Sequence, residues 1–174
     1  PSGVTLAPEG GAHQSIASPL IGMSQDGLAA FEPAFADELA IIMEWAFAHM
    51  QKDGEGDPDE RTWLRDETGG SVYLRLTTNP IEQPGKRVDD DFRQGAIDGA
   101  YWLRKPGPNC EVVIAYQGAV AQEAIKAAGH IAQGRRDVGV LAVTSADRLN
   151  AGWTAAQRAR SNGISGAEAH LVAL

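Results

Sequence analysis

The sequence predicts an α/β fold in which a helix connects two parallel strands. Two short apolar runs, Cys110–Tyr116 and Val138–Val143, flank a segment, Ala119–Ala132, whose apolar residues recur at helical spacing. Runs that are apolar on both faces indicate strands paired in parallel beneath helices, and such a crossover is right-handed. A stretch with two prolines and several acidic residues, 80–91, separates this βαβ unit from an earlier helix and strand. We therefore expect two lobes with a linker between them.

Length and composition limit the classes of protein that this chain can represent. The 174 residues fit one domain or two small ones, and 43% of them are apolar, which is ordinary for a folded protein. The net charge of −8 argues against a nucleic-acid partner and against an anionic membrane surface. A single cysteine, Cys110, excludes an internal disulfide and a cysteine-cluster metal site, so we expect a cytoplasmic location. No apolar run reaches the roughly 18 residues of a membrane span.

The first lobe is expected to hold one long helix and one strand. Residues 1–30 are rich in Gly, Ser and Pro and predict loops with short extended pieces. A helix is predicted over Ala34–Met50, opened by Pro33, whose missing N–H costs little at the start of a helix. Its wide apolar arc predicts burial on more than one side; the arc comprises Leu39, Ile41, Ile42, Met43, Trp45, Ala46 and Phe47. The segment 51–70 contains an acidic run broken by Gly and Pro, which predicts a solvated loop. Apolar residues alternate with more polar ones over Ser71–Thr78, which predicts a strand with one wetter face.

The second lobe surrounds the βαβ unit. Its first element is predicted as a helix over Phe92–Leu103, although two glycines interrupt it. Gly118 is expected in the tight turn that follows the first apolar strand. The tail, Ala146–Leu174, is predicted to be helical with breaks at Gly152 and Gly163.

The most pointed chemical signal is the loop PEGGAHQS, residues 8–15. Its two glycines let the backbone approach a ligand closely, and they leave the imidazole of His13 with little steric cover. One interpretation is that His13 forms a hydrogen bond to a polar substrate. The alternative is a surface histidine without a role, because many loops merely connect elements.

The remaining histidines and the cysteine favour structural or surface roles. His49, His130 and His170 fall on predicted helices far apart in sequence, and no pair has the spacing of a zinc motif. Cys110 opens an apolar strand, where we expect a buried and inert thiol. No metal ligand is therefore predicted in this chain.

Two further segments resemble ligand loops but lack the full patterns. The stretch YQGAVAQ around Gly118 has only the first glycine of a dinucleotide fingerprint, so a packing turn is favoured. The acidic run DGEGDPDE lacks the regular ligand spacing of a calcium loop, so a solvated loop is favoured. Taken alone, the residues predict an acidic α/β protein without a complete catalytic set.

From PEGGAHQS onward the chain resembles the thiamine-diphosphate transketolase superfamily, and most closely the homodimeric decarboxylating component of pyruvate dehydrogenase. In that family a His-containing, Gly-rich loop precedes a strand, a Pro-bearing turn and a helix, which is the order in PEGGAHQSIASPLIGMSQDGLAAFEPAFADELAIIMEWAF. SVYLRLTTNP resembles the last strand of the pyrimidine-binding domain, and CEVVIAYQGAVAQEAIKAAGHIAQGRRDVGVLAVTSADRLNAGW resembles the start of the C-terminal domain. The resemblance implies that residues 1–80 end a pyrimidine-binding domain, 81–91 form a linker, and 92–174 begin a transketolase-like C-terminal domain.

The resemblance implies roles for three residues. His13 matches the loop histidine that faces the substrate, so it is expected to be catalytic and substrate-binding, with Gln14 beside it as a second substrate contact. Sugar-phosphate transketolases place an arginine where this chain has Thr78. The loss of that phosphate clamp implies a small 2-oxo acid substrate, such as pyruvate.

The resemblance also implies that the chain is a fragment of a longer parent. The family binds thiamine diphosphate and Mg²⁺ through Gly-Asp-Gly followed by Asn, and no Gly-Asp-Gly occurs in this sequence. The cofactor and metal are therefore expected only in the full-length parent, and the fragment alone is expected to be inactive. The parent would be a homodimer that passes an acyl group to a lipoyl-bearing acyltransferase.

Three alternatives stay open at this point. The first is that the chain is a non-catalytic dimerisation or interaction module, which the wide apolar arc of the Ala34–Met50 helix supports. The second is a transketolase that acts on another ketose or oxo acid. The third is that the βαβ unit at 110–144 binds a nucleotide by itself.

Overall fold

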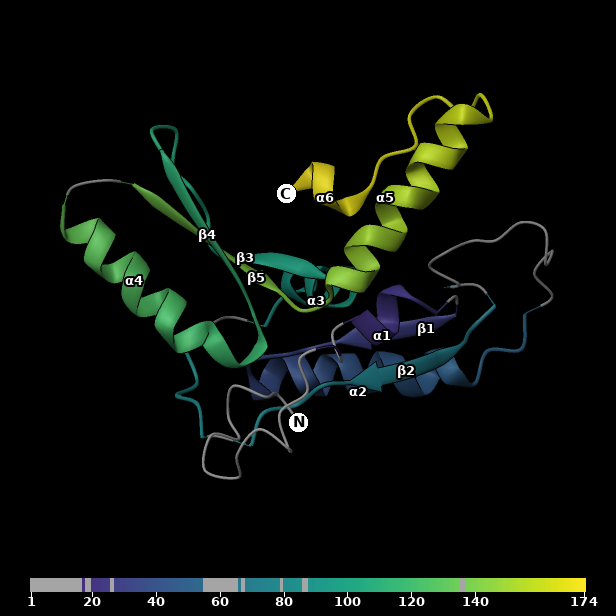
Figure 1. Cartoon of the computed structure of the whole chain (residues 1–174), viewed down its shortest axis with the longest axis horizontal. Helices are drawn as coiled ribbons and strands as arrows, with labels where there is room; N and C mark the ends of the chain where they lie inside the picture. The colour runs from purple at the N-terminus through teal and green to yellow at the C-terminus, as the bar shows by residue number, and fades with distance from the viewer. Residues whose placement is uncertain are drawn as a thin grey trace.

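The computed structural model describes residues 17, 20–25, 27–54, 66, 68–78, 80–85, 88–134 and 137–174 (Figure 1). It is a mixed α/β structure with one two-stranded and one three-stranded sheet among these residues. In chain order the elements are α1 (Leu20–Met23), β1 (Leu28–Phe31), α2 (Ala36–Met50), β2 (Ser71–Leu74), α3 (Asp90–Asp98), β3 (Ala100–Arg104), β4 (Val112–Gln117), the 3-10 turn η4 (Gly118–Val120), α4 (Ala121–Gln133), β5 (Val138–Val143), α5 (Ala146–Ser161) and α6 (His170–Ala173).

The first lobe is a parallel pair of strands packed against a long helix. β1 and β2 run in parallel, with Leu28 opposite Ser71 and Phe31 opposite Leu74. The core of this lobe joins Phe31 of β1 to Ile42 of α2, with Trp45 packed beside them. The predicted helix and strand are both confirmed, although β2 ends at Leu74 rather than at Thr78.

Helix α2 is buried on two sides, as its wide apolar arc predicts. Ile42 packs into the core of the first lobe, whereas Phe35 and Ile41 belong to the core of the second. The two lobes therefore share this helix. The predicted arc is too wide at one edge, because Met43 and Phe47 are 38% and 55% exposed.

The second lobe contains the predicted βαβ unit. Its strand order is β3-β5-β4, in which β4 and β5 are parallel and α4 connects them. Small residues of α4 pack on the sheet; they are Ala121, Ala124 and Ala128. Helix α4 covers one face of the sheet, while α5 and α6 border the other (Figure 1). The parallel strands and the crossover helix are thus confirmed.

The prediction of one helix over Phe92–Leu103 is wrong in its second half. Helix α3 ends at Asp98, and β3 then pairs antiparallel with β5. Gly99 ends the helix because it adopts φ = +114°, a conformation that L side chains rarely accept. A Cβ at Gly99 would also lie 2.6 Å from the carbonyl oxygen of Ser145. The aromatic residues that follow Gly99 then favour a strand.

Two smaller expectations also change. Helix α5 continues through Gly152 without a break and ends at Ser161, before Gly163. Tertiary packing of the helix outweighs the modest propensity cost of one glycine. Cys110 lies just before β4 and is half-buried rather than buried, with its thiol 3.1 Å from the carbonyl oxygen of Val112.

Candidate functional site

The two residues predicted to contact substrate, His13 and Gln14, lie outside the described residues. Their roles stay predictions. The first described element after them is α1, which is followed directly by β1.

Among the described residues, the carboxyl ends of all four parallel strands converge on one place, which we call the interlobe junction. It comprises Glu32 after β1, Arg75 after β2, Gly118 after β4 and Thr144 after β5. The backbone N–H of Glu32 donates to the carbonyl oxygen of Thr144 at 2.7 Å, which ties the first lobe to the second. In open α/β sheets, ligands bind outside the carboxyl ends of the strands, so the junction is the natural place to look for a site.

An ion pair occupies the centre of the junction. The Nη1 atom of Arg75 lies 2.6 Å from Oε1 of Glu32, and the two side chains are only 11% and 10% exposed. At such low exposure, each charge needs the other for compensation. The backbone N–H of Arg75 also donates to the carbonyl oxygen of Phe31, which continues the pairing beyond β2.

The Glu32 side chain also fills the space in front of the turn that follows β4. Gly118 has φ = +59°, and a Cβ there would lie 2.6 Å from the carboxylate oxygen of Glu32. In dinucleotide-binding folds the pyrophosphate binds at this point, against the amino end of the following helix. A protein carboxylate therefore lies where a nucleotide phosphate would be expected. This contact supports the packing-turn interpretation of Gly118 and disfavours nucleotide binding at this turn.

A second buried polar group joins α2 to the sheet of the second lobe. Glu38 is 1% exposed, and its carboxylate accepts hydrogen bonds from the backbone N–H groups of Ala34 at 2.7 Å and Phe35 at 2.9 Å. It also accepts a hydrogen bond from the hydroxyl of Tyr101 in β3. The carboxylate thus satisfies the free N–H groups before α2 and holds the start of that helix against β3.

The tyrosines beside Glu38 are weaker acids than an ordinary tyrosine. Burial, together with the nearby carboxylate, raises the pKa of Tyr101 far above its usual range. The same two causes raise the pKa of Tyr116 in β4. Both hydroxyls therefore remain protonated at neutral pH, and the Glu38 group is suited to positioning rather than to acid–base chemistry.

A third cluster centres on Trp45. His49 stacks on its ring with centroids 4.4 Å apart, and the guanidinium of Arg148 lies 4.7 Å from the ring centroid. Arg148 comes from the first turn of α5 and forms two hydrogen bonds to Asp66, at 2.9 and 3.0 Å. Its side chain is 3% exposed, so an arginine of the second lobe is buried against the first.

The surroundings of His49 disfavour its protonation. Its ring is buried, and burial lowers its pKa, with further lowering by Arg148 and Lys52 and an opposing effect from Asp66. Its Nδ1 atom has no hydrogen-bond partner among the described residues. The expected structural role of this histidine is consistent with its burial.

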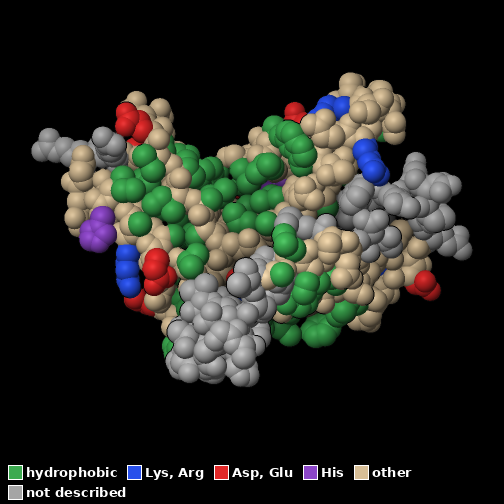
Figure 2. All heavy atoms as spheres, in the orientation of Figure 1, with side chains coloured by type: hydrophobic (Ala, Val, Ile, Leu, Met, Phe, Trp, Pro, Cys, Tyr) green, Lys and Arg blue, Asp and Glu red, His purple; other side chains and the backbone are tan. Residues whose placement is uncertain are grey.

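An apolar groove of about 600 Å³ lies on the sheet face opposite α4 (Figure 2). It runs between the carboxyl ends of β4 and β5 and the first half of α5, and Trp153 and Leu171 border it. Gln117 and Asn150 are the amide side chains in its described lining, which includes no charged group. The groove therefore offers hydrophobic contact and amide hydrogen bonds, but no acid or base.

The described residues do not fit a metal–diphosphate group. No set of three His, Cys, Asp or Glu side chains among them is placed to hold a metal ion. The one turn that resembles a phosphate cradle, at Gly118, is filled by Glu32. No described helix has the length and apolar character needed to cross a bilayer.

Sequence reasoning missed the polar groups that join the lobes. Glu32 and Arg75 each directly follow a strand. Polar residues in that position are candidates for a site at the carboxyl edge of a parallel sheet, and this was the signal that the sequence offered. Arg148 was not singled out either, since an arginine in the first turn of a helix is usually exposed. Only the fold brings it against Trp45, which lies 103 positions earlier in the chain.

Comparisons with known proteins identify the fold. No family model matches the chain, and no curated protein matches it. Among solved structures, a transketolase mutant from Pichia stipitis has a TM-score of 0.65 at 16% identity and covers 86% of this chain. Transketolase from Leishmania mexicana has a TM-score of 0.60 at 19% identity and covers 82%. A split-gene transketolase described as an inactive beta4 tetramer has a TM-score of 0.50 at 17% identity and covers 84%.

The chain therefore has a transketolase-like fold, which confirms the predicted fold class. It spans a small part of the proteins that it resembles: 19% of the Pichia stipitis chain, 18% of the Leishmania mexicana chain and 41% of the split-gene chain. At these identities the likeness concerns the fold alone.

Proposed function

We propose that the chain is part of a thiamine-diphosphate-dependent enzyme, and that this enzyme is the decarboxylating component of a pyruvate dehydrogenase. The likeness to transketolases over 86% of the chain, with a TM-score of 0.65, supports the first part of the proposal, a thiamine-diphosphate-dependent enzyme. The choice of pyruvate dehydrogenase rests on the sequence resemblance and on Thr78. The sequence resemblance through the PEGGAHQS loop points in the same direction. The domain assignment proposed with it is 1–80, 81–91 and 92–174.

In this proposal, thiamine diphosphate and Mg²⁺ are bound by parts of a longer parent. Thiamine diphosphate, when bound, supplies the carbanion chemistry that 2-oxo acid decarboxylation needs. The described residues of this chain lack a set that fits the metal and diphosphate, so their part is to build the scaffold. His13 and Gln14 would bind and orient the substrate.

The proposed substrate is a small 2-oxo acid. Thr78 stands where sugar-phosphate enzymes are expected to have an arginine, and it is exposed after the end of β2. A threonine hydroxyl cannot replace the two parallel hydrogen bonds that a guanidinium makes to phosphate. The acyl group would then pass to a lipoyl-bearing acyltransferase, and the parent would act as a homodimer in the cytoplasm.

Transketolase activity on a ketose is the second candidate, and the solved structures that the chain resembles favour it. The two activities are separated by one pair of assays on the full-length parent with thiamine diphosphate and Mg²⁺. Our proposal predicts release of carbon dioxide from pyruvate and no ketol transfer between sugar phosphates. Ketol transfer without carbon dioxide release would instead establish the second candidate.

A non-catalytic interaction module is the third candidate, favoured by the exposed apolar residues of α2. It predicts that the full-length parent releases no carbon dioxide from pyruvate and transfers no ketol group, although it folds and assembles.

A further inference from the structure

The chain turns at the far end of α5 and returns beside that helix to α6 (Figure 1). The turn itself is fixed to α5, because the backbone N–H groups of Gly163 and Ile164 donate to carbonyl oxygens in the last turns of the helix, each at 3.0 Å. These two hydrogen bonds are the usual closure of a helix end at which a glycine is left-handed. The residues that follow the turn, 167–174, are held in a different way, and we call them the strap.

Two side-chain hydrogen bonds fasten the strap to β3. The imidazole of His170 donates from Nε2 to the carbonyl oxygen of Ala100 at 2.8 Å. The indole N–H of Trp102 donates to the carbonyl oxygen of Leu174 at 2.7 Å. Both ends of α6 are therefore attached to the same strand.

Apolar burial adds little to these two attachments. None of the four residues of α6 is buried, and Leu171 and Val172 are 46% and 55% exposed. Ala169, at 4% exposed, is the buried residue of the strap, and a single methyl group contributes much less than a large side chain. A segment that depends on a few hydrogen bonds opens at a lower cost than the core does.

Gly166 lies directly before the strap and supplies a hinge. Its φ is +87°, and no described atom lies within 4 Å of the position that a Cβ would take there. The residue can therefore change its φ and ψ without a clash, whereas an L residue is disfavoured at the φ of the present conformation. Rotation at Gly166 moves the strap and leaves the closure of α5 in place.

The strap forms one wall of a cavity of about 280 Å³ beside α5. The strap contributes Ala167, Glu168, Ala169 and His170 to this cavity. Small residues of α5 line it as well; they are Gly152, Ala155, Ala156 and Ala159. Movement of the strap away from α5 would remove a wall of the cavity and open it to solvent.

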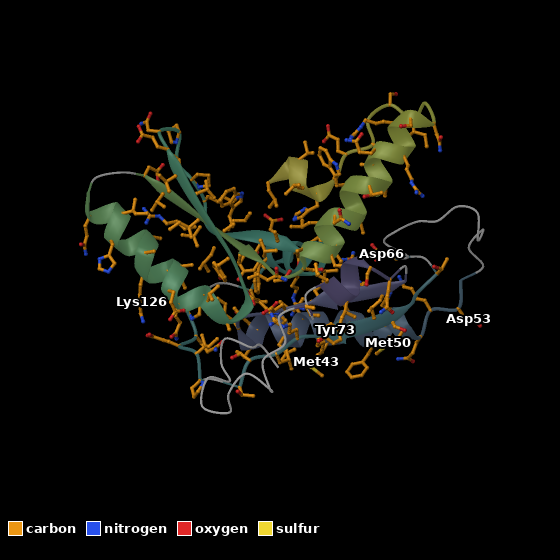
Figure 3. The ribbon with its side chains drawn as sticks, in the orientation of Figure 1. Met43, Met50, Asp53, Asp66, Tyr73 and Lys126 are labelled. Atoms are coloured by element: carbon orange, nitrogen blue, oxygen red, sulfur yellow. The ribbon has the colours of Figure 1, made fainter. Side chains whose placement is uncertain are left out.

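The cavity also reaches the contact between the lobes. Arg148, which is 3% exposed, lines it, and its guanidinium is bound by Asp66, which Figure 3 labels. Asp98 stands between the strap and this arginine, since its two carboxylate oxygens lie 3.8 Å from Nη2 of Arg148 and 3.9 Å from Nδ1 of His170. The strap therefore covers the second-lobe side of the contact, and its opening admits water to the cavity that Arg148 lines.

We propose that residues 167–174 are a hinged cover, which opens about Gly166 and controls access to the cavity between the strap and α5. The hydrogen bond from His170 to Ala100 holds the closed state. In the open state, solvent and small solutes reach the side chain of Ala156 inside the cavity. The proposal goes beyond the catalytic activity proposed above and does not depend on it.

The rate of thiol labelling by the aromatic disulfide DTNB tests the cover. In a Cys110→Ser background, Ala156→Cys places a thiol in the cavity, where Ala156 is 6% exposed. We expect it to react about 10-fold or more slowly than Lys126→Cys, an exposed position on α4 (Figure 3). His170→Ala should raise the Ala156→Cys rate by about 5-fold, the effect of one hydrogen bond on the opening equilibrium. Ala151→Cys is the matched control, because Ala151 is 8% exposed on the same helix and is not among the residues that line the cavity, so its rate should stay unchanged.

Gly166→Ala tests the hinge without removing a contact. The closed strap needs φ = +87° at this position, so alanine favours the open state, and the Ala156→Cys rate should rise by about 10-fold. An unchanged Ala156→Cys rate in either His170→Ala or Gly166→Ala would overturn the proposal. An equal rise at Ala151→Cys would overturn it too, because α5 would then be loosening as a whole. These measurements need no cofactor or substrate, so their outcome is separate from that of the proposed function.

Discussion

At the scale of single residues, Glu32 and Arg75 illustrate how a polar pair can hold two sheets in place without acting on a ligand. The pair is almost fully buried, at 2.6 Å, where the parallel strands of both lobes end. Such a pair contributes little net stability relative to apolar replacements, yet either charge is costly when it is left alone. This asymmetry can be measured.

We therefore predict that Arg75→Met destabilises the chain by about 3 kcal/mol, because the Glu32 carboxylate is left buried without its partner. The double variant Glu32→Gln/Arg75→Met should recover much of that loss. Urea unfolding followed by circular dichroism measures both. The exposed pair Glu44–Arg93 is the control, and Arg93→Met should cost less than about 1 kcal/mol. Equal losses at the two pairs would show that burial does not set the cost.

His49 gives a prediction about pH. Burial lowers the pKa of His49 below its ordinary value of 6.5 in the folded chain, so the unfolded chain binds a proton first as pH falls. Stability should therefore fall as pH drops below 6.5 and continue to fall down to the folded pKa. Urea midpoints at about pH 7.5 and about pH 5.5 test this, with His49→Gln compared in parallel. A wild-type midpoint that drops no more than that of His49→Gln would contradict the assignment.

At the scale of elements, the turn between β4 and α4 joins the βαβ unit to the first lobe. The sequence indicates this unit well, because two apolar runs and an amphipathic helix need no distant partner to be recognised. It indicates less well that the Gly118 turn faces the carboxylate of Glu32, which directly follows β1, since that contact joins residues 86 positions apart. The prediction of one helix over Phe92–Leu103 joins α3 and β3 for a similar reason. The left-handed conformation of Gly99 that separates them is tied to its close contact with Ser145, which is distant in sequence.

We predict that Gly118→Ala destabilises the chain by about 2 kcal/mol. The new Cβ would meet Glu32 at 2.6 Å, and φ = +59° is unfavourable for alanine. Gly129→Ala on α4 is the matched control, because a Cβ there meets nothing within 4 Å. This second change should stabilise the helix by about 1 kcal/mol. Thermal unfolding of the two variants should thus shift in opposite directions; destabilisation by both would mean that the Glu32 contact is not the cause.

At the scale of the whole molecule, α2 belongs to both lobes. Ile42 faces one core and Ile41 the other, while Arg148 of α5 is buried against Trp45 of the same helix. The periodicity of the sequence predicts that α2 is amphipathic, but it cannot say which apolar residues meet their partners within the chain. Met43, Phe47 and Met50 are 38%, 55% and 47% exposed, so not every apolar residue of the helix meets a partner among the described residues.

The candidate site is less predictable than the fold. The resemblance through PEGGAHQS draws attention to His13, which lies outside the described residues. The polar groups that the structure does describe come from the ends of four strands and from the first turn of α5. Their convergence depends on strand order and on the crossover, so no local motif marks them. Physical pattern reading therefore finds the elements, and the fold is needed to find the junction.

The central claim is that this chain contributes His13 to the decarboxylation of a 2-oxo acid, and the rate of carbon dioxide release from pyruvate tests it most directly. The assay uses the full-length parent with thiamine diphosphate and Mg²⁺, and it compares His13→Ala with His130→Ala, which alters an exposed histidine on α4. We predict that His13→Ala lowers kcat by about 100-fold, the usual effect of removing a positioned proton-transfer group, and that His130→Ala leaves it unchanged. Carbon dioxide release at the wild-type rate by His13→Ala would contradict the account.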